Sequence, residues 1–254
     1  MIQAIRAEWE KIWFPKSSRL YLPIAMIFSI LMGLVLAFTT EITQNKALSE
    51  LKPMSVIEVN MLGVDVVTIL LIFFTAVQIG REFQGKTIQT YLTATPDRTR
   101  YFVAKLLTYF SLSLVVGVIV ALIVLGNGQL MLSAIHGQTL PASEVWQFVA
   151  GCVAMPLFYI WLTVSAAFLS RNTAAGIVIP LVVLFLPAIA ELFPGSIQDV
   201  IVPILPASAI HSLSGVAQSG SIEYTGIVTA FLILIIWSLL TSILAVWSFR
   251  HKDI

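Results

Sequence analysis

Eight residues, Gly80 to Thr87, match the phosphate-binding pattern G-x-x-x-x-G-K-[ST], in which backbone amides and a lysine hold the phosphates of a nucleotide. Gly85 and Lys86 supply the second glycine and the lysine. A working phosphate loop also needs a β-strand before it, a helix whose N-terminal amides point at the phosphates, and a second acidic motif for magnesium. Here a long apolar segment precedes Gly80 and no strand-rich region follows. We therefore expect no nucleotide binding by this chain.

The other residue types that do chemistry are scattered. His136, His211 and His251 have no carboxylate or cysteine at metal-ligand spacing, so we expect no metal site and no cofactor. The serines beside His211 lack the glycine pattern of a nucleophile turn, so no catalytic residue is predicted. Asp65 is different, because a carboxylate inside an apolar segment is costly and indicates either a functional site or a partner. Snorkelling or a helix cap near the interface is the alternative explanation for Asp65.

Composition indicates which elements must position these residues. Hydrophobic residues make up 58% of the 254 positions and charged residues 11%, which leaves too little polar surface for a soluble domain. A span of about 20 apolar residues crosses the hydrocarbon core, and the alternating pattern of a membrane barrel is absent. We therefore predict an all-α, integral membrane six-helix bundle that forms a single domain, residues 1–254. The six predicted spans are residues 20–40, 59–79, 102–125, 145–169, 174–192 and 225–249.

The first 16 residues predict an amphipathic helix that lies in the membrane interface and ends near Pro15. Tryptophans favour headgroup depth, and the charges in this stretch are unlike a cleavable signal peptide. The apolar positions of this helix recur at three- and four-residue steps, and we expect its charged residues on the other faces. The apolar positions are Ile2, Ile5, Trp9, Ile12 and Trp13.

Residues 192–224, before the last span, are too broken by proline to cross the membrane and too apolar for an ordinary exposed loop. We predict one or two short re-entrant helices that dip into the outer leaflet. Such a geometry is tolerated only where protein or a water-filled cavity satisfies the backbone. An interfacial loop without a special role is the alternative.

The distribution of lysine and arginine predicts the orientation. With the N-terminus in the cytoplasm, 12 of the 14 basic residues fall on the cytoplasmic side, and only Lys46 and Lys52 fall outside. Both termini are therefore predicted to be cytoplasmic. A charge costs about 3 kcal/mol at the bilayer centre, so we also expect the charged segment 78–105 to be a loop in water.

Residues 80–100 predict a cytoplasmic loop that contains a short amphipathic helix and a turn at residues 95–98. The loop resembles the first cytoplasmic loop of type-two ABC transporter permeases, in which a glutamate, Gly-Thr, a leucine-rich stretch, a Pro/Ser-x-Arg turn and a lysine-leucine pair follow one another. Here Lys86 stands between Gly85 and Thr87, which departs from that pattern and produces the phosphate-loop match. The beginning of the chain, with Ala7, Glu8 and Glu10-Lys11, is similar to the family's Ala-Glu-x-x-Lys start. The matching loop positions are Glu82, Thr87, Leu92, Pro96, Arg98 and Lys105-Leu106.

The resemblance implies that two six-span subunits, of the same or a different chain, pair in the membrane and that two copies of a separate ABC ATPase dock below them. The loop would then be the coupling helix that sits in a groove of the ATPase. The implied ATPase-coupling residues are Arg81, Glu82, Phe83, Gly85, Thr87, Tyr91, Leu92, Pro96 and Arg98.

We therefore expect a permease subunit of an ATP-driven ABC exporter in a bacterial cell membrane, without enzymatic activity of its own. Similar subfamilies protect against peptide antibiotics such as lantibiotics, which implies an amphipathic or hydrophobic substrate: an antimicrobial peptide, a lipid or a drug. Membrane lipid is an expected partner, and nucleic acid is not. The alternative is a motor-independent carrier or scaffold protein. A carrier should show paired intramembrane charges, and Asp65 alone supports it weakly.

Overall fold

The structure, a computed structural model, describes residues 2–44, 53–85, 87–88 and 97–251. Within these ranges the chain forms helices and turns and contains no β-strand. In chain order the helices are α1 (Ile2–Trp13), α2 (Lys16–Gln44), α3 (Pro53–Gln84), α5 (Arg98–His136), α6 (Ala142–Ser170), α7 (Thr173–Ala190), α8 (Gly195–Ile201), the 3₁₀ turn η2 (Val202–Ile204), α9 (Pro206–Ser214) and α10 (Ile227–His251).

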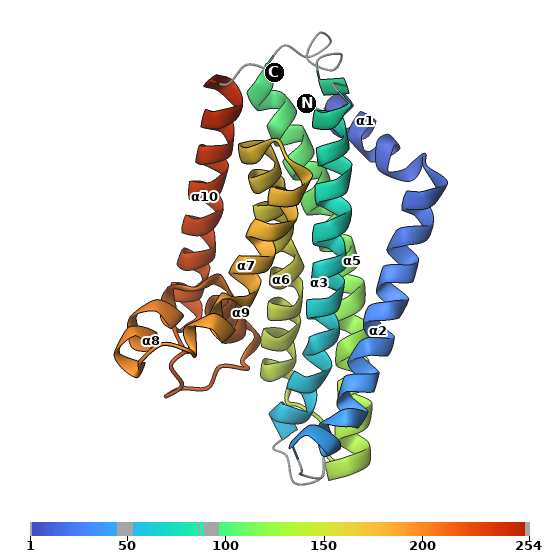
Figure 1. Cartoon of the computed structure of the whole chain (residues 1–254). Coiled ribbons are helices and arrows are strands. Elements are labelled where there is room, and N and C mark those ends of the chain that lie inside the picture. The colour runs from blue at the N-terminus through green and yellow to red at the C-terminus, as the bar shows by residue number, and fades with distance from the viewer. Residues whose placement is uncertain (1, 45–52, 86, 89–96, 252–254) are drawn as a thin grey trace.

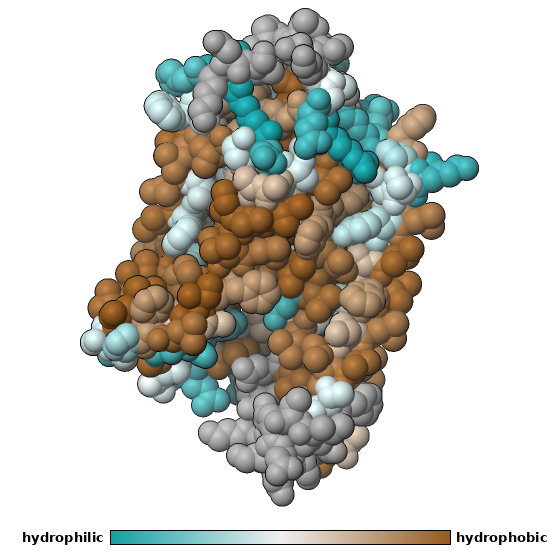
Figure 2. All heavy atoms as spheres, in the orientation of Figure 1, coloured by the Kyte–Doolittle hydropathy of each residue, from teal (hydrophilic) through white to brown (hydrophobic). Residues whose placement is uncertain are grey.

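Six of the described helices are long and apolar enough to cross a membrane, namely α2, α3, α5, α6, α7 and α10. They lie side by side along one axis (Figure 1), and a broad hydrophobic band covers the visible face of the bundle, with hydrophilic residues gathered at the upper end (Figure 2). The all-α, six-span membrane fold predicted from the sequence is confirmed.

Helix α5 is much longer than its predicted span. It has 39 residues and is about 58 Å long at 1.5 Å per residue, so it extends beyond a hydrocarbon core of about 30 Å. The predicted third span ended at residue 125, but the helix continues through Gly126 and Gly128 and ends at His136. The buried Gly128 and Leu132 show why, since this part of α5 still packs against protein. The C-cap residue that follows, Gly137, adopts a positive φ of 65°.

Helix α6 lies at the centre of the bundle and packs against α3, α5, α7, α9 and α10. Small residues let neighbouring helices approach closely. A Cβ on Gly117 of α5 would lie 3.0 Å from the Cγ atom of Pro156 in α6. Similarly, a Cβ on Gly33 of α2 would lie 3.3 Å from the Cα atom of Gly63 in α3. These contacts fix which faces of the spans point inward.

The segment between α7 and α10 contains two short helical pieces, Gly195–Ile204 and Pro206–Ser214, which are bent by 71° relative to each other. The bend falls at Leu205, whose extended backbone is the conformation that a following proline imposes. Helix α9 is buried against α6, α7 and α10, whereas no residue of α8 is buried. In Figure 1, α8 projects from the lower part of the bundle. This bent pair has the shape expected of a re-entrant segment, and its depth in the membrane stays a prediction.

Helix α1 lies across one end of the bundle instead of running parallel to the spans (Figure 1). The face of α1 that packs on the bundle is not its whole apolar face. Ile12 is buried, but Ile2 and Trp13 of the predicted apolar face are exposed, and the charged Glu8 is buried. The reason is that the inward face of α1 meets Lys105, a cation buried in α5.

Candidate functional site

A cluster of charged groups joins α1, α3 and α5 at the end of the bundle where α1 lies. The Lys105 side chain is 1% exposed, and its ammonium group lies 2.6 Å from the carboxylate of Glu8 and 2.7 Å from that of Glu82. The Tyr101 hydroxyl donates a hydrogen bond to Glu82 at 2.5 Å. Lys11 pairs with both carboxylates and lies 3.6 Å from Glu82. We call these five residues the junction cluster.

The junction cluster is electrically balanced, with two carboxylates and two ammonium groups. Burial by itself raises the pKa of Glu8, but the charges of Lys105 and Lys11 outweigh it and hold that pKa below its ordinary value. Glu8 is therefore ionised at neutral pH. A buried ion pair adds little stability over an apolar replacement, but removal of one partner leaves an uncompensated charge and is strongly destabilising.

The location of Lys105 corrects one expectation. We expected all charges between residues 78 and 105 to lie in water, because each is costly inside a membrane. Lys105 instead lies inside the protein, since Glu8 and Glu82 neutralise it there. The sequence did identify these residues, because all three belong to the motifs that resemble the permease family. It did not show that they meet, since 97 residues separate Glu8 from Lys105.

An aromatic cluster lies beside the charged one and binds the ends of four helices together. Phe168 of α6 packs edge-on against Phe83 of α3, Phe102 of α5 and Phe249 of α10, with ring centroids 5.4, 5.1 and 5.1 Å apart. Arg98 donates a hydrogen bond to the carbonyl oxygen of Phe249 at 2.9 Å. The beginning of α5 is therefore tied to the end of α10.

The implied ATPase-coupling residues fall into three groups. Glu82, Phe83 and Arg98 contact other helices of this chain, as described above. Arg81, Gly85 and Thr87 are exposed. Tyr91, Leu92 and Pro96 lie outside the described residues. The predicted coupling loop therefore begins as the last turns of α3, and contact of these residues with an ATPase stays a prediction.

The phosphate-loop match has a structural explanation that involves no nucleotide. Residues 80–84 are the C-terminal end of α3, so they form no loop that could surround a phosphate. Gly80 is required by packing, because a Cβ there would lie 1.8 Å from the Oγ1 atom of Thr173 at the beginning of α7. Lys86 lies outside the described residues. The absence of nucleotide binding by this chain stays a prediction.

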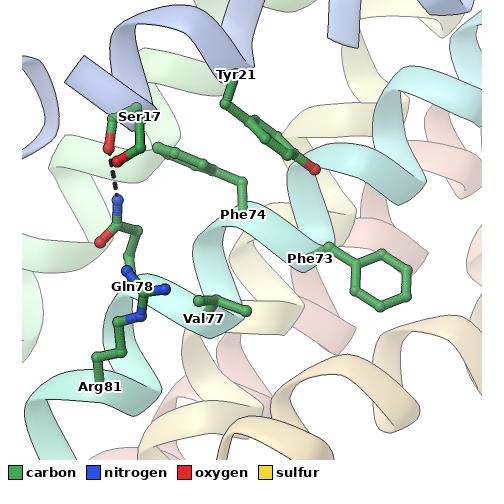
Figure 3. A pocket seen from close by; sticks show the side chains of 8 residues that line it. Ser17, Tyr21, Phe73, Phe74, Val77, Gln78 and Arg81 are labelled. Carbon is green, nitrogen blue, oxygen red and sulfur yellow. Dashed lines mark hydrogen bonds between the residues drawn. The ribbon is translucent and has the colours of Figure 1, made fainter. Parts of the chain in front are cut away.

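A cavity of about 250 Å³ opens between α2 and α3 near the same end of the bundle (Figure 3). The amide of Gln78 donates a hydrogen bond to the Ser18 hydroxyl at 2.8 Å, and Arg81 lies beside it. The Tyr21 ring stacks on Phe74 at 5.3 Å. Arg81 therefore lies at the edge of a cavity that has apolar walls and a polar rim.

Asp65 lies far from the junction cluster, about 9 Å from the end of the span that begins at Val59. It lines a cavity of about 290 Å³ together with Tyr159, His211 and Glu223. His211 Nδ1 lies 2.8 Å from the carboxylate of Glu223. This hydrogen bond holds the pKa of Glu223 below its ordinary value, against the opposing effect of burial. The sequence suggested Asp65 but not its neighbours, because helix packing brings them together.

The fold and these sites define a multi-pass helical membrane protein with a buried charged junction at one end and an acidic cavity toward the other. A family model described as "ABC-2 family transporter protein" matches residues 4–187, well over half of the chain. The chain belongs to this family, so it is a membrane permease component of an ABC transporter and works with an ATPase partner. It is a transport component and not itself catalytic. No curated protein matches the sequence.

Proposed function

We propose that this chain is the permease subunit of an ATP-driven exporter in a bacterial cell membrane, with both termini in the cytoplasm. Two such subunits, the same or different chains, would pair, and two ATPase subunits would dock at their cytoplasmic ends. The observation that carries this proposal is the junction cluster. It holds α1, the end of α3 and the beginning of α5 together, on both sides of the segment that resembles a coupling loop.

The junction cluster suits the transmission of force. The buried pairs of Lys105 are costly to separate, so α1, α3 and α5 should move as one unit when an ATPase pushes on the loop between α3 and α5. In this proposal Glu82, Phe83 and Arg98 position the loop from inside the bundle. The residues that contact the ATPase are Arg81, Gly85 and Thr87, with Tyr91, Leu92 and Pro96.

The proposed substrate is amphipathic or hydrophobic, such as an antimicrobial peptide, a lipid or a drug. The proposed direction of transport is outward, as in the ABC exporters that the sequence resembles. The bent pair of helices around Leu205 would then close the outer end of the pathway. Its buried half, α9, contacts α6, α7 and α10, so a movement of any of these three spans would displace it.

The test is a pull-down of the tagged chain from its native host in mild detergent, with protein identification and an ATP hydrolysis assay on the recovered material. We expect an ABC ATPase with the wild type and with the control Glu144→Gln, whose carboxylate is exposed on α6 away from the cluster. We expect much less ATPase with Glu82→Gln. Arg81→Gln should also lower recovery, and it leaves the junction cluster intact.

A chain that is recovered alone, without ATP hydrolysis, would contradict the exporter proposal and favour the motor-independent carrier or scaffold. Full recovery of the ATPase with both Glu82→Gln and Arg81→Gln would keep the exporter but refute this end of the bundle as the docking end. Size-exclusion profiles of each variant separate a lost contact from a protein that fails to fold.

A further inference from the structure

The Asp65 cavity has no role in the coupling proposal, and its chemistry is specific. It lies between α3, α6, α7 and α9 and is closed on one side by the chain segment before α10 that carries Glu223. Its walls are mainly apolar and include Ile69, Met155, Leu184, Phe185 and Ile210. A molecule inside it would therefore meet hydrocarbon and aromatic surface over most of its area.

Two polar groups that line this cavity have no hydrogen-bond partner among the described residues. The Tyr159 side chain is fully buried, and its hydroxyl group makes no hydrogen bond. The half-buried Asp65 carboxylate lines the same cavity as Tyr159 and His211 but forms neither a hydrogen bond nor an ion pair with a described residue. Buried polar groups are normally satisfied, and a lone carboxylate at membrane depth is costly. A ligand that satisfies both groups would remove this cost.

The charge of the residues that line the cavity indicates which charge a bound ligand should carry. The described residues around the cavity include three carboxylates, from Asp65, Glu191 and Glu223, and no lysine or arginine. His211 is the one group there that can become positive, so the lining stays negative in either state of its imidazole. The described residues contain no group of three or more His, Cys, Asp or Glu side chains that could hold a metal ion. An organic cation therefore fits better than a bare metal ion.

We propose that this cavity binds the ammonium group of a cationic amphipathic molecule. Asp65 acts as the counter-ion, the Tyr159 oxygen accepts a second hydrogen bond, and the apolar body of the molecule lies against the walls that include Leu184 and Phe185. A hydrogen bond to a charged group contributes more than a neutral one, so Asp65 dominates the affinity and Tyr159 adds to it. The inference rests on the proposed export function where it names a substrate class, but the binding itself does not require ATP or an ATPase.

The test measures binding to the full chain in lipid nanodiscs, with hexylammonium as the probe and the uncharged hexanol as the control ligand. A ligand that binds the folded state raises the unfolding temperature in proportion to its occupancy, so titration of this shift gives an apparent Kd. We expect hexylammonium to stabilise the wild type and hexanol to have little effect. Asp65→Asn should weaken hexylammonium binding by about tenfold or more, and Tyr159→Phe by a few-fold.

The matched control is Asp199→Asn, which makes the same change on the exposed helix α8 and should leave the affinity unchanged. Equal binding of hexylammonium and hexanol to the wild type would overturn the proposal without any variant. Unchanged affinity in both Asp65→Asn and Tyr159→Phe would do the same. Because this assay contains no ATPase, its failure would leave the exporter proposal standing, and a failed pull-down would leave the cation site standing.

Discussion

Lys105 is the residue on which the position of α1 depends, because its ammonium group is removed from water and held by carboxylates from two other helices. We predict that Lys105→Met lowers the free energy of unfolding by about 3–5 kcal/mol, because Glu8 and Glu82 are left with Lys11 alone. The measurement is denaturant-induced unfolding in detergent.

The control for this prediction is Arg6→Met, which breaks an exposed ion pair between Arg6 and Glu10 on the same helix. Exposed pairs contribute little, so this change should have a small effect. Equal destabilisation by the two substitutions would show that burial of the charges is unimportant.

Glu8 also makes the stability of the junction cluster depend on pH. Its pKa in the folded protein lies below the ordinary value of 4.5, so its contribution is fully present above that value and is lost as the pH falls through the folded pKa. We predict that the difference in unfolding free energy between the wild type and Glu8→Gln is constant near neutral pH and shrinks below about pH 4.5. A difference that grows on acidification would contradict the assigned ion pairs.

At the scale of helices, Gly151 determines how closely α9 packs against α6. A Cβ at Gly151 would lie 2.2 Å from the Cβ of Ser214 and 2.6 Å from its Cα, so backbone must move to admit it. We predict that Gly151→Ala destabilises the protein by about 1–3 kcal/mol and makes residues 195–226 more sensitive to protease. Thermal unfolding and limited proteolysis measure the two effects.

Gly126 is the matched control, because it is also helical and a Cβ there meets nothing within 4 Å. Gly126→Ala should be neutral or stabilise the helix by roughly 0.5–1 kcal/mol. If both alanines have the same effect, the change reflects helix propensity and not the contact with α9.

The helices also show what the sequence could and could not predict. Apolar runs of sufficient length identify the six spans, because the cost of exposing backbone to lipid leaves a helix as the available structure for such runs. Periodicity did not predict that Glu8 of α1 would be buried, since Glu8 is polar by type and buried through a partner 97 residues away. The third span was predicted to end at residue 125, but α5 continues to His136, because its last turns still pack against protein. Contacts of this kind depend on the tertiary arrangement, which local patterns do not encode.

For the whole molecule, the proposed orientation can be tested directly. Cys152 is fully buried, so Cys152→Ala gives a background without cysteine in which single cysteines report exposure. We predict that a membrane-impermeant maleimide labels Ser219→Cys in intact cells. Gln3→Cys should react only after the membrane has been permeabilised, because the reagent then reaches the cytoplasmic side. Both native side chains are exposed in the described structure. Labelling of Gln3→Cys but not of Ser219→Cys in intact cells would contradict the proposed topology.

The junction cluster has one more consequence, which concerns the order in which the protein is made. Glu8 leaves the ribosome long before Lys105, and a lone charge is costly to place in a membrane, so neither residue can take its final position early. We expect helix α1 to stay at the membrane surface until α3 and α5 have been inserted with the orientation that brings Glu82 to the same side. Docking of α1 is therefore expected to be a late assembly step, which depends on the first three spans having the right topology.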